Sequence, residues 1–295
     1  MVQDCLSFLK MQNSNSKINE EIITIIYQLI IAWLIFLFRF KIPNFEIYLS
    51  ITLAITVMVS LVRLISCDHK DPILNSVRHW YSIAVLLISF FVLGKVIQYI
   101  NPQDIDNTLI KLDYFIFGVN PTVWLEKITF PILTEILQII YCTYFFLPIF
   151  FGVILLSKGK HTEFHRVLSS ILCAFYFNYI LYIIFPAIGP RYTLNHLQSF
   201  PLTGIFFTSL IRDGLSNLEG IHRDVFPSGH TAVPLVVLYF SYKYERKIFY
   251  ILLPIVIAMI FSTVYLRYHY VIDVISGVVL AGISIKLFRV VSRSS

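Results

Sequence analysis

Long apolar runs separated by polar connections dominate the pattern along this chain. A membrane-spanning helix needs roughly 20 mostly apolar residues, and in lipid only helices or closed barrels satisfy the backbone hydrogen bonds. Continuous apolar runs of this length therefore predict helices. Eight runs stand out, of which the sixth is short: about 22–40, 46–66, 79–100, 130–156, 166–187, 230–243, 247–265 and 270–289. The pattern predicts an all-α fold, a polytopic transmembrane helical bundle.

Two polar connections are longer than the others. Residues 101–129 contain an apolar stretch, 113–125, that is too short and too broken to span, so we expect a re-entrant or interfacial helix there. Residues 188–229 are polar, contain Gly and Pro, and lead directly into the sixth apolar run. We find no internal repeat, no low-complexity tract and no soluble domain.

The composition agrees with lipid as the solvent. Of the 295 residues, 57% are hydrophobic and 14% charged, whereas soluble domains have about 25% charged residues. The net charge of +6 does not indicate a nucleic-acid partner, because Lys and Arg are scattered at span ends. Placing both termini in the cytoplasm fits the excess of basic residues on that side. The basic residues then inside are Lys10, Lys17, Arg63, Lys70, Arg78, Lys158, Lys160, Arg166, Lys243, Arg246, Lys247, Lys286, Arg289 and Arg293.

The four cysteines and the N-terminus give no further site. Cys5, Cys67, Cys142 and Cys173 lie far apart, without the close pairs of a zinc or redox site, and no disulfide is predicted. Residues 1–21 are polar and precede a long apolar run, so we interpret the first span as retained and not as a cleaved signal peptide.

Three short segments hold most of the unusual polar residues, and this topology brings all three to the outer membrane face. They are residues 185–192, which close the fifth span, 226–231, which open the sixth, and 262–273, which join the seventh and eighth. Convergence of distant segments at one depth is what an active site requires. Arg223, just before the second segment, is as easily explained by a structural role as by a functional one.

The second segment contains Pro227-Ser-Gly-His230. Ser228 suits a helix N-cap, and Gly229 lets a ligand approach the backbone closely. The free N–H groups and the dipole of a helix start attract phosphate, and His230 would project from this first turn. The alternative is an ordinary helix cap beside an interfacial histidine.

The third segment places His269 and Asp273 four residues apart, on one face of a helix. A carboxylate there can fix the tautomer that leaves the other ring nitrogen available to attack, although a structural His–Asp pair is the alternative. Arg191 and Arg267 supply positive charge that suits phosphoryl oxygens. The alternative for each arginine is a side chain that extends to the lipid headgroups.

Together these segments resemble the type-2 phosphatidic acid phosphatase superfamily, whose motifs are Lys-x6-Arg-Pro, Pro-Ser-Gly-His and Ser-Arg-x5-His-x3-Asp. The resemblance covers residues 79–290 and implies a six-helix phosphatase core in residues 79–295, preceded by two extra spans in residues 1–78. Three positions depart from the motifs: Ile184 stands for Lys, Tyr192 for Pro and Thr263 for Arg. We expect Arg267 to replace that missing arginine. The variant motifs are similar to the inositol-phosphorylceramide-synthase-like branch.

The resemblance implies a role for each site residue. His269 would be the nucleophile that forms a phosphohistidine, oriented by Asp273, and His230 the general acid and then base. Arg191 and the backbone amides of Ser228 and Gly229 would bind phosphoryl oxygens. The implied chemistry needs no metal and no other cofactor. The expected partners are a phosphorylated lipid and the bilayer.

Alternatives to a phosphatase remain open. Transfer of the phosphoryl headgroup to an alcohol needs a pocket for that alcohol, which Tyr192, His196, Tyr265, Tyr268 and Tyr270 would supply unless they are interfacial aromatics. A catalytically inactive, lipid-binding relative is a second alternative. A transporter is a third, although the spans show few mid-depth charges and no inverted repeat.

Overall fold

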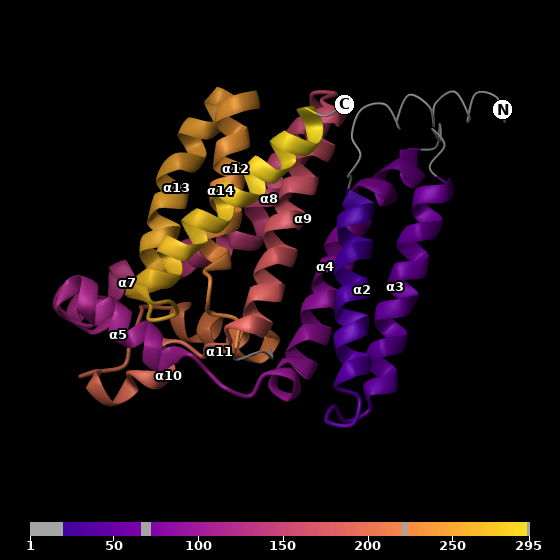
Figure 1. Cartoon of the computed structure of the whole chain (residues 1–295). Helices are drawn as coiled ribbons and strands as arrows, with labels where there is room; N and C mark the ends of the chain where they lie inside the picture. The colour runs from indigo at the N-terminus through magenta and orange to yellow at the C-terminus, as the bar shows by residue number, and fades with distance from the viewer. Residues whose placement is uncertain (1–19, 66–71, 220–222, 294–295) are drawn as a thin grey trace.

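The computed structural model describes residues 20–65, 72–219 and 223–293. These residues form a bundle of helices, with no strand among them (Figure 1). The helices are α2 (Glu20–Leu37), α3 (Phe45–Ile65), α4 (Pro72–Ile100), α5 (Asp106–Phe117), α6 (Pro121–Trp124), η1 (Leu125–Ile128), α7 (Pro131–Cys142), η2 (Thr143–Phe145), α8 (Phe146–Ser157), α9 (His161–Ile184), α10 (Pro190–Thr193), η3 (Asn195–Leu197), α11 (Thr208–Glu219), α12 (Gly229–Tyr244), α13 (Arg246–Tyr265) and α14 (Val271–Arg293). The predicted all-α class is confirmed.

All eight predicted runs are helical in the structure. Six described segments are long and apolar enough to cross a membrane: Glu20–Leu37, Phe45–Leu64, Trp80–Ile100, Pro131–Ser157, His161–Ile184 and Arg246–Tyr265. The chain is therefore a multi-pass integral membrane protein. Neither α12 nor α14 is among these six. With 16 residues, α12 is about 24 Å long at 1.5 Å per residue, shorter than a hydrocarbon core of about 30 Å.

The short helix α12 lies at the centre of the bundle, against α8, α9, α13 and α14. Its apolar residues Val233, Val236 and Val237 are fully buried. The closest approach is to α14, where a Cβ atom on Gly277 would lie 2.6 Å from the Ser228 carbonyl oxygen. A glycine is therefore required at this crossing. The crossing holds the starts of two helices that carry site residues.

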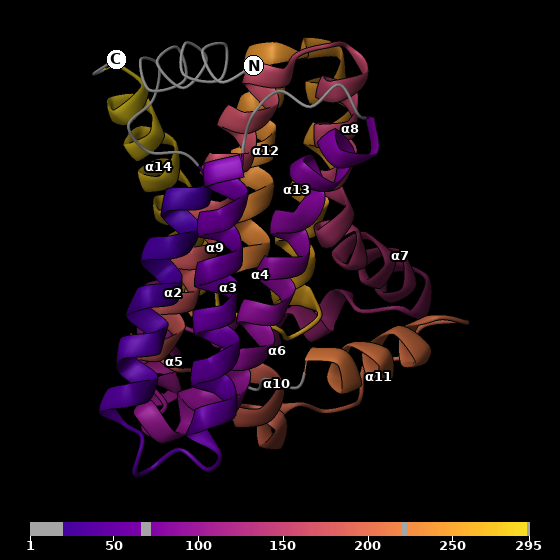
Figure 2. The ribbon, with the colours of Figure 1, turned by 90° about the vertical axis from the view of Figure 1, so that its right-hand side faces the viewer.

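The fourth predicted span, 130–156, is one apolar run but not one straight helix. It consists of α7 and α8 joined by the 3₁₀ turn η2. Pro148 explains the interruption, because it has no N–H to donate to the carbonyl of Tyr144. Figure 2 shows α7 leaving the axis of α8. The bend directs the α7 end of the span toward the other segments at the site.

The two ends of the bundle differ in what they hold. At one end, Lys158 and Lys160, which follow α8, pair with Glu245 between α12 and α13 at 2.5 and 2.8 Å. The start of α2 and the end of α14 lie at this same end (Figure 1). The three predicted site segments lie at the opposite end, so their predicted convergence on one face is confirmed. Which end is cytoplasmic remains a prediction.

Some sequence-based expectations concern residues outside the described part of the chain. These are the retained N-terminal segment, the basic residues Lys10, Lys17 and Lys70, and the cysteines Cys5 and Cys67. Within the described part, Cys142 and Cys173 form no disulfide.

The long connections contain helices that shape the site end. In the first connection, α5 is a separate helix of 12 residues, too short to span, in agreement with the non-spanning helix expected there. Its position in a bilayer remains a prediction. In the second, the sequence analysis did not anticipate α11. Both helices lie across the site end of the bundle (Figures 1 and 2). They expose large apolar side chains there, namely Phe115 on α5, Phe206 just before α11 and Leu210 on α11.

The two N-terminal spans pack on the remaining helices through aromatic side chains. Tyr27 of α2 stacks on Tyr176 of α9, with ring centroids 4.3 Å apart. Both rings belong to one large core cluster that also contains residues of α4, α8 and α12. The division at residue 78 into an N-terminal region and a six-helix core remains a prediction.

Candidate active site

Two histidines from different segments face each other at the site end. His230 is the second residue of α12, and His269 lies in the turn between α13 and α14. Their ring centroids are 5.8 Å apart, with 53° between the ring planes. The ring of His230 stacks on Tyr141 at 4.1 Å and packs against Tyr144 at 4.0 Å. We call His230 and His269 the histidine pair.

Backbone hydrogen bonds fix the turn that carries His269. The carbonyl of Thr263 accepts hydrogen bonds from the N–H groups of both Tyr268 and His269, each at 3.0 Å. The Thr263 side chain is uncharged and fully buried. It therefore does not supply the positive charge that the motif arginine would bring. The position that departs from the motif thus shapes the turn through its main chain.

The predicted contact between His269 and Asp273 is present but long. His269 Nδ1 lies 3.5 Å from Asp273 Oδ2, which is beyond ordinary hydrogen-bond length. The same Asp273 oxygen accepts a hydrogen bond from the N–H of Tyr270 at 2.9 Å. The fully buried Asp273 therefore contributes to the site by holding the turn beside His269 in place.

A second acidic residue, Asp224, interacts electrostatically with His269. Burial lowers the pKa of His269 to about 4, while the charge of Asp224 and a hydrogen bond to the backbone of Val225 act in the opposite direction. Burial raises the pKa of Asp224 to about 6, and the charge of His269 opposes that rise. His269 is therefore neutral near pH 7, as a nucleophilic imidazole must be. The sequence analysis did not single out Asp224.

The helix start at Ser228 differs from the predicted phosphate site. Ser228 is the N-cap of α12, as predicted, but its side chain makes no capping hydrogen bond. Its N–H donates to the carbonyl of Asp273 at 3.1 Å. The N–H of Gly229 donates to the amide oxygen of Asn178 at 3.2 Å, in the Asn178 orientation that satisfies its partners. Both amides have protein acceptors in this structure, and the expectation that they bind phosphate stays a prediction.

Gly229 does permit a close approach to the backbone, but the approaching groups belong to the protein. A Cβ atom there would lie 2.6 Å from the Asn178 amide atom that faces Gly229, its oxygen in this orientation, and 3.2 Å from the hydroxyl oxygens of Tyr144 and Tyr182. The buried Asn178 also donates to the carbonyl of Pro227 at 3.0 Å. Asn178 therefore positions the start of α12 and hence His230.

Two buried carboxylates on α5 hold the other two segments. Asp106 accepts hydrogen bonds from the N–H groups of Ile188 and Gly189, at 2.9 and 2.8 Å, and from the Tyr270 hydroxyl at 2.8 Å. Asp113 accepts from the first two N–H groups of α14, those of Val271 and Ile272, both at 2.9 Å. Burial raises the pKa of Asp113, and these backbone hydrogen bonds oppose the rise. One short helix thus aligns the segments around Arg191 and Asp273.

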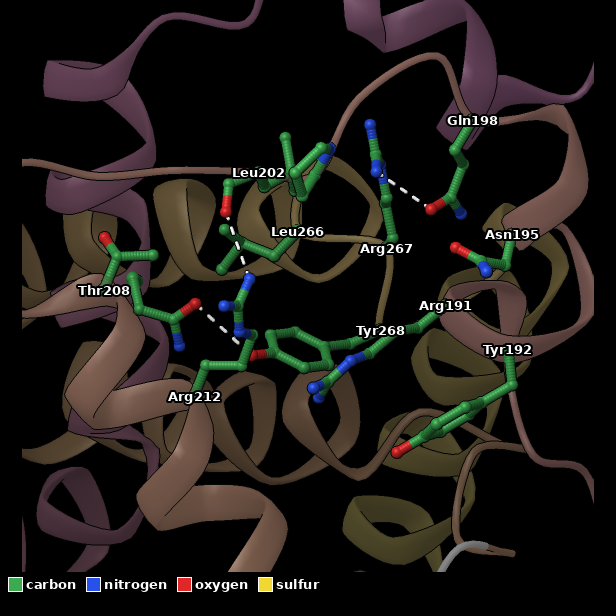
Figure 3. A pocket seen from close by; sticks show the side chains of 12 residues that line it. Arg191, Tyr192, Asn195, Gln198, Leu202, Thr208, Arg212, Leu266, Arg267 and Tyr268 are labelled. Carbon is green, nitrogen blue, oxygen red and sulfur yellow. Dashed lines mark hydrogen bonds between the residues drawn. The ribbon is translucent and has the colours of Figure 1, made fainter.

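Beside the histidine pair lies a cavity of about 330 Å³ with Arg191 in its wall (Figure 3). The Arg191 guanidinium lies 5.8 Å from the ring centroid of Tyr268 and 5.6 Å from that of Tyr192. The ring of Tyr268 in turn stacks on Tyr141 at 4.6 Å, and Tyr141 stacks on His230. We call this space the arginine cavity. Its lining residues are Gln138, Arg191, Tyr192, Asn195, Gln198, Pro201, Leu202, Thr208, Arg212, Leu266, Arg267 and Tyr268.

Arg267 borders this cavity, but its guanidinium is directed toward protein groups. It forms an ion pair with Glu126 at 2.7 Å and donates to Gln198 and to the carbonyl of Phe200 at 2.8 and 2.9 Å. Figure 3 shows it pointing toward Gln198, away from Arg191. The guanidinium of Arg267 is thus held by Glu126, Gln198 and Phe200, and its role as a replacement for the missing motif arginine stays a prediction.

Arg223 has a structural role. Its Nε lies 2.8 Å from an oxygen of Asp104, and its Nη2 donates to the carbonyl of Pro102 at 3.2 Å. These contacts tie the segment before α12 to the segment before α5.

The comparison with protein families decides the identity. Residues 108–287, more than half of the chain, match the PAP2 superfamily. The chain belongs to this superfamily. A PA-phosphatase related-family protein of Dictyostelium discoideum is 28% identical over 165 residues, which are 49% of this chain and 30% of that protein. The match therefore spans under a third of that relative's length. No solved structure matches the chain.

Membership in the PAP2 superfamily suggests a phosphatase-type enzyme. The match includes His230, His269, Asp273 and Arg191 and begins within α5, whereas α2, α3 and α4 precede it. The predicted resemblance is thus confirmed at the level of the superfamily, while the inositol-phosphorylceramide-synthase-like branch remains a prediction.

The five aromatic residues suggested for an alcohol pocket separate into groups. Tyr192 and Tyr268 line the arginine cavity. Tyr265 and Tyr270 are buried, and their hydroxyl groups contact Thr134 and Asp106, respectively. His196 is exposed in η3. Only the first two of these five are placed to contact a ligand in the cavity.

Proposed function

We propose that this protein is a lipid-phosphate phosphatase that acts through a phosphohistidine intermediate. The observation that carries the proposal is the histidine pair, two imidazoles 5.8 Å apart and contributed by separate segments. An arrangement of this kind suits a nucleophile and a general acid that act on the same phosphorus atom.

In the proposed reaction, His269 Nε2, the nitrogen that does not face Asp273, attacks the phosphorus atom. The N–P bond forms as the bond from phosphorus to the lipid oxygen breaks, and His230 donates a proton to that oxygen. Water then attacks the phosphohistidine while His230 accepts a proton from it. The N–P bond breaks, inorganic phosphate leaves, and both histidines return to their starting states.

Arg191 is the proposed ligand of the phosphoryl oxygens, because a guanidinium can bind two of them at once. Ser228 and Gly229 are not included, since their amides hold Asp273 and Asn178. We place the reaction at the non-cytoplasmic face, which follows from the basic residues at the opposite end of the bundle. Maleimide labelling of single cysteines introduced at residues 41 and 158 in sealed vesicles tests this orientation.

The test of the reaction uses the purified full-length chain in detergent with EDTA and dioctanoyl phosphatidic acid. We expect release of inorganic phosphate, a phosphoenzyme that is stable in base and labile in acid, and loss of both in His269→Ala. The matched control is His196→Ala, which alters an exposed histidine at the same end and should retain activity. Full turnover by His269→Ala would exclude the proposed nucleophile, and dependence on added metal would exclude metal-independent chemistry.

A lipid headgroup phosphotransferase is the second candidate, favoured by the cavity lined by Tyr192 and Tyr268 next to the histidine pair. In that reaction an alcohol in place of water accepts the phosphoryl headgroup. A panel of lipid phosphates, assayed with and without inositol or glycerol, separates the two activities by their products. No turnover of any lipid in the panel would favour a catalytically inactive, lipid-binding relative.

A further inference from the structure

The described residues that line the arginine cavity supply hydrogen-bond donors and positive charge. They include three arginines, Arg191, Arg212 and Arg267, and no carboxylate. Two carboxylates contact this set from outside: Glu126 is engaged by Arg267, and Glu135 accepts hydrogen bonds from Thr208. A volume of about 330 Å³ is within the range of small-molecule sites. The charge of the lining favours an anionic ligand.

Two buried donors of the lining have no hydrogen-bond partner among the residues that the structure describes. Gln138 is 2% exposed and its Nε2 makes no hydrogen bond, while Arg267 is 4% exposed and its Nε makes none. The Tyr268 hydroxyl donates to Gln138 Oε1 at 3.3 Å, which directs the amide nitrogen to the other side. Unsatisfied buried donors are rare and cost free energy. Their presence in one cavity indicates that a ligand with acceptor oxygens satisfies them.

The third arginine, Arg212, is held at the cavity by an anchored helix. It lies on α11 and donates to the carbonyl of Leu202 at 3.1 Å. The start of α11 is fixed to α7 by Glu135, which accepts hydrogen bonds from the N–H groups of Ile205, Phe207 and Thr208 and from the Thr208 hydroxyl. The carboxylate also lies where a Cβ atom of Gly204 would be. Arg212 is therefore part of a preformed wall.

The cavity adjoins the place where we expect the phosphoryl transfer and shares Arg191 with it, but it does not include the histidines. Neither His230 nor His269 lines it. The ring of Tyr268 lies between them, since one side of this residue borders the cavity and its ring stacks on Tyr141, the neighbour of His230. Along this stack, the rings of Tyr268 and Tyr141 separate a ligand group in the cavity from His230.

We propose that the arginine cavity binds a second phosphoryl group, distinct from the one that reacts at the histidines. As a substrate subsite it rests on the proposed function, and it narrows the substrate class to lipids whose headgroup carries a second phosphoryl group. Gln138, Arg212 and Arg267 are the specificity residues of this subsite. A free phosphate ion has the same chemistry, so the test separates the two sources.

The test measures binding in the full-length chain with His269→Ala, so that no probe is consumed. The probes are dioctanoyl phosphatidylglycerol phosphate, dioctanoyl phosphatidic acid and inorganic phosphate, at fixed ionic strength, with thermal unfolding in detergent as the readout. Both lipids carry the terminal phosphate that would react at the histidines, and only phosphatidylglycerol phosphate carries a second phosphoryl group. We expect phosphatidylglycerol phosphate to bind about tenfold or more tightly than phosphatidic acid, the effect of a lost charged hydrogen bond.

Two variants locate the binding. Arg212→Gln removes a charge, and Gln138→Glu keeps the acceptor for Tyr268 but replaces the unpaired donor with an oxygen. Both variants should abolish the preference for phosphatidylglycerol phosphate. The control is Arg39→Gln, which alters an arginine between α2 and α3 at the same end of the bundle and should retain the preference. Thermal unfolding measured without any probe identifies a variant that does not fold. In that case the other variant tests whether the cavity binds the second phosphoryl group.

The remaining outcomes are also decisive. Inorganic phosphate binding that is lost in both variants assigns the cavity to a free anion, and a preference seen only between the lipids assigns it to a headgroup. Equal affinities of the two lipids together with no binding of phosphate, or variants that bind like the parent, overturn the proposal. Failure of the proposed function appears differently, as a wild-type chain that turns over no lipid phosphate while the binding preference persists.

Discussion

The histidine pair and the arginine cavity lie on either side of Tyr268 and differ in how their polar groups are satisfied. Around the histidines, protein groups hold almost every segment: Asn178 holds the start of α12, Thr263 the turn before His269, and Asp113 the start of α14. In the cavity, the side-chain donors of Gln138 and Arg267 have no hydrogen-bond partner among the described residues, whereas beside the histidines the unpaired side-chain atoms are His269 Nδ1 and Asp273 Oδ1.

This difference separates two tasks. Groups that move protons or form bonds must be held in one geometry before the substrate arrives. Groups that recognise a ligand can leave their donors unpaired until the ligand supplies the acceptors. The structure therefore predicts that changes around the histidines alter turnover, whereas changes in the cavity alter affinity.

The largest effect is expected for His230→Gln, which keeps a polar side chain beside Tyr141 but cannot act as acid and base. Loss of a general acid–base group lowers kcat by about 10²- to 10⁴-fold. Initial rates of phosphate release from dioctanoyl phosphatidic acid measure this, with His196→Gln as the matched control. A change in KM alone would mean that His230 belongs to the recognition side of the comparison.

An intermediate effect is expected at α5. Asp113→Ala removes both acceptors at the start of α14, and a displacement of reacting groups of about 1 Å can cost roughly 100-fold in rate. We expect kcat to fall by about 10- to 100-fold with little change in phosphate binding by the cavity. Asp113→Asn, which keeps one acceptor oxygen, should recover part of the rate. Equal losses of rate and binding in Asp113→Ala would indicate general unfolding.

A smaller effect is expected for Asp224→Asn on the pH profile. The charge of Asp224 raises the pKa of His269, which burial holds at about 4. Removal of that charge should lower the His269 pKa further, so the neutral nucleophile persists to lower pH. The acid limb of kcat/KM, measured between pH 4 and 7, should therefore move to lower pH in the variant. A limb that moves to higher pH would contradict the electrostatic coupling.

The features that sequence could predict are those with a local signal. Apolar runs gave the helices because lipid imposes one rule on every span. The His230 and His269 segments can be recognised from sequence because the residues of each motif are close together along the chain. The i, i+4 spacing places Asp273 near His269, as expected. The roles of the arginines are harder to predict, because a charge pattern in sequence does not distinguish an Arg267 that binds a ligand from one that pairs with a carboxylate such as Glu126.

The features that could not be predicted depend on contacts between residues distant in sequence. Asp106 and Asp113 are separated by at least 80 residues in sequence from the N–H groups that donate hydrogen bonds to them. Glu135 is separated by about 70 residues from the start of α11. An acidic residue in a connection has the same appearance in sequence whether it faces solvent or a backbone amide. The regular i, i+7 spacing of Asp106 and Asp113 was a usable signal, because it places both on one face of a helix.

The smallest effect tests whether Tyr268 truly divides the two regions. Tyr268→Phe keeps the ring on Tyr141 and removes only the hydroxyl that orients Gln138. A neutral hydrogen bond contributes about 0.5–1.5 kcal/mol, and at 3.3 Å this one is long, so anion affinity should fall only a few-fold. Tyr268→Leu removes the ring as well and should also lower kcat, because His230 and Tyr141 lose the third ring of their stack. If Tyr268→Phe lowered kcat as much as Tyr268→Leu, the hydroxyl itself would take part in the chemistry, and the cavity and the histidine pair would form a single site.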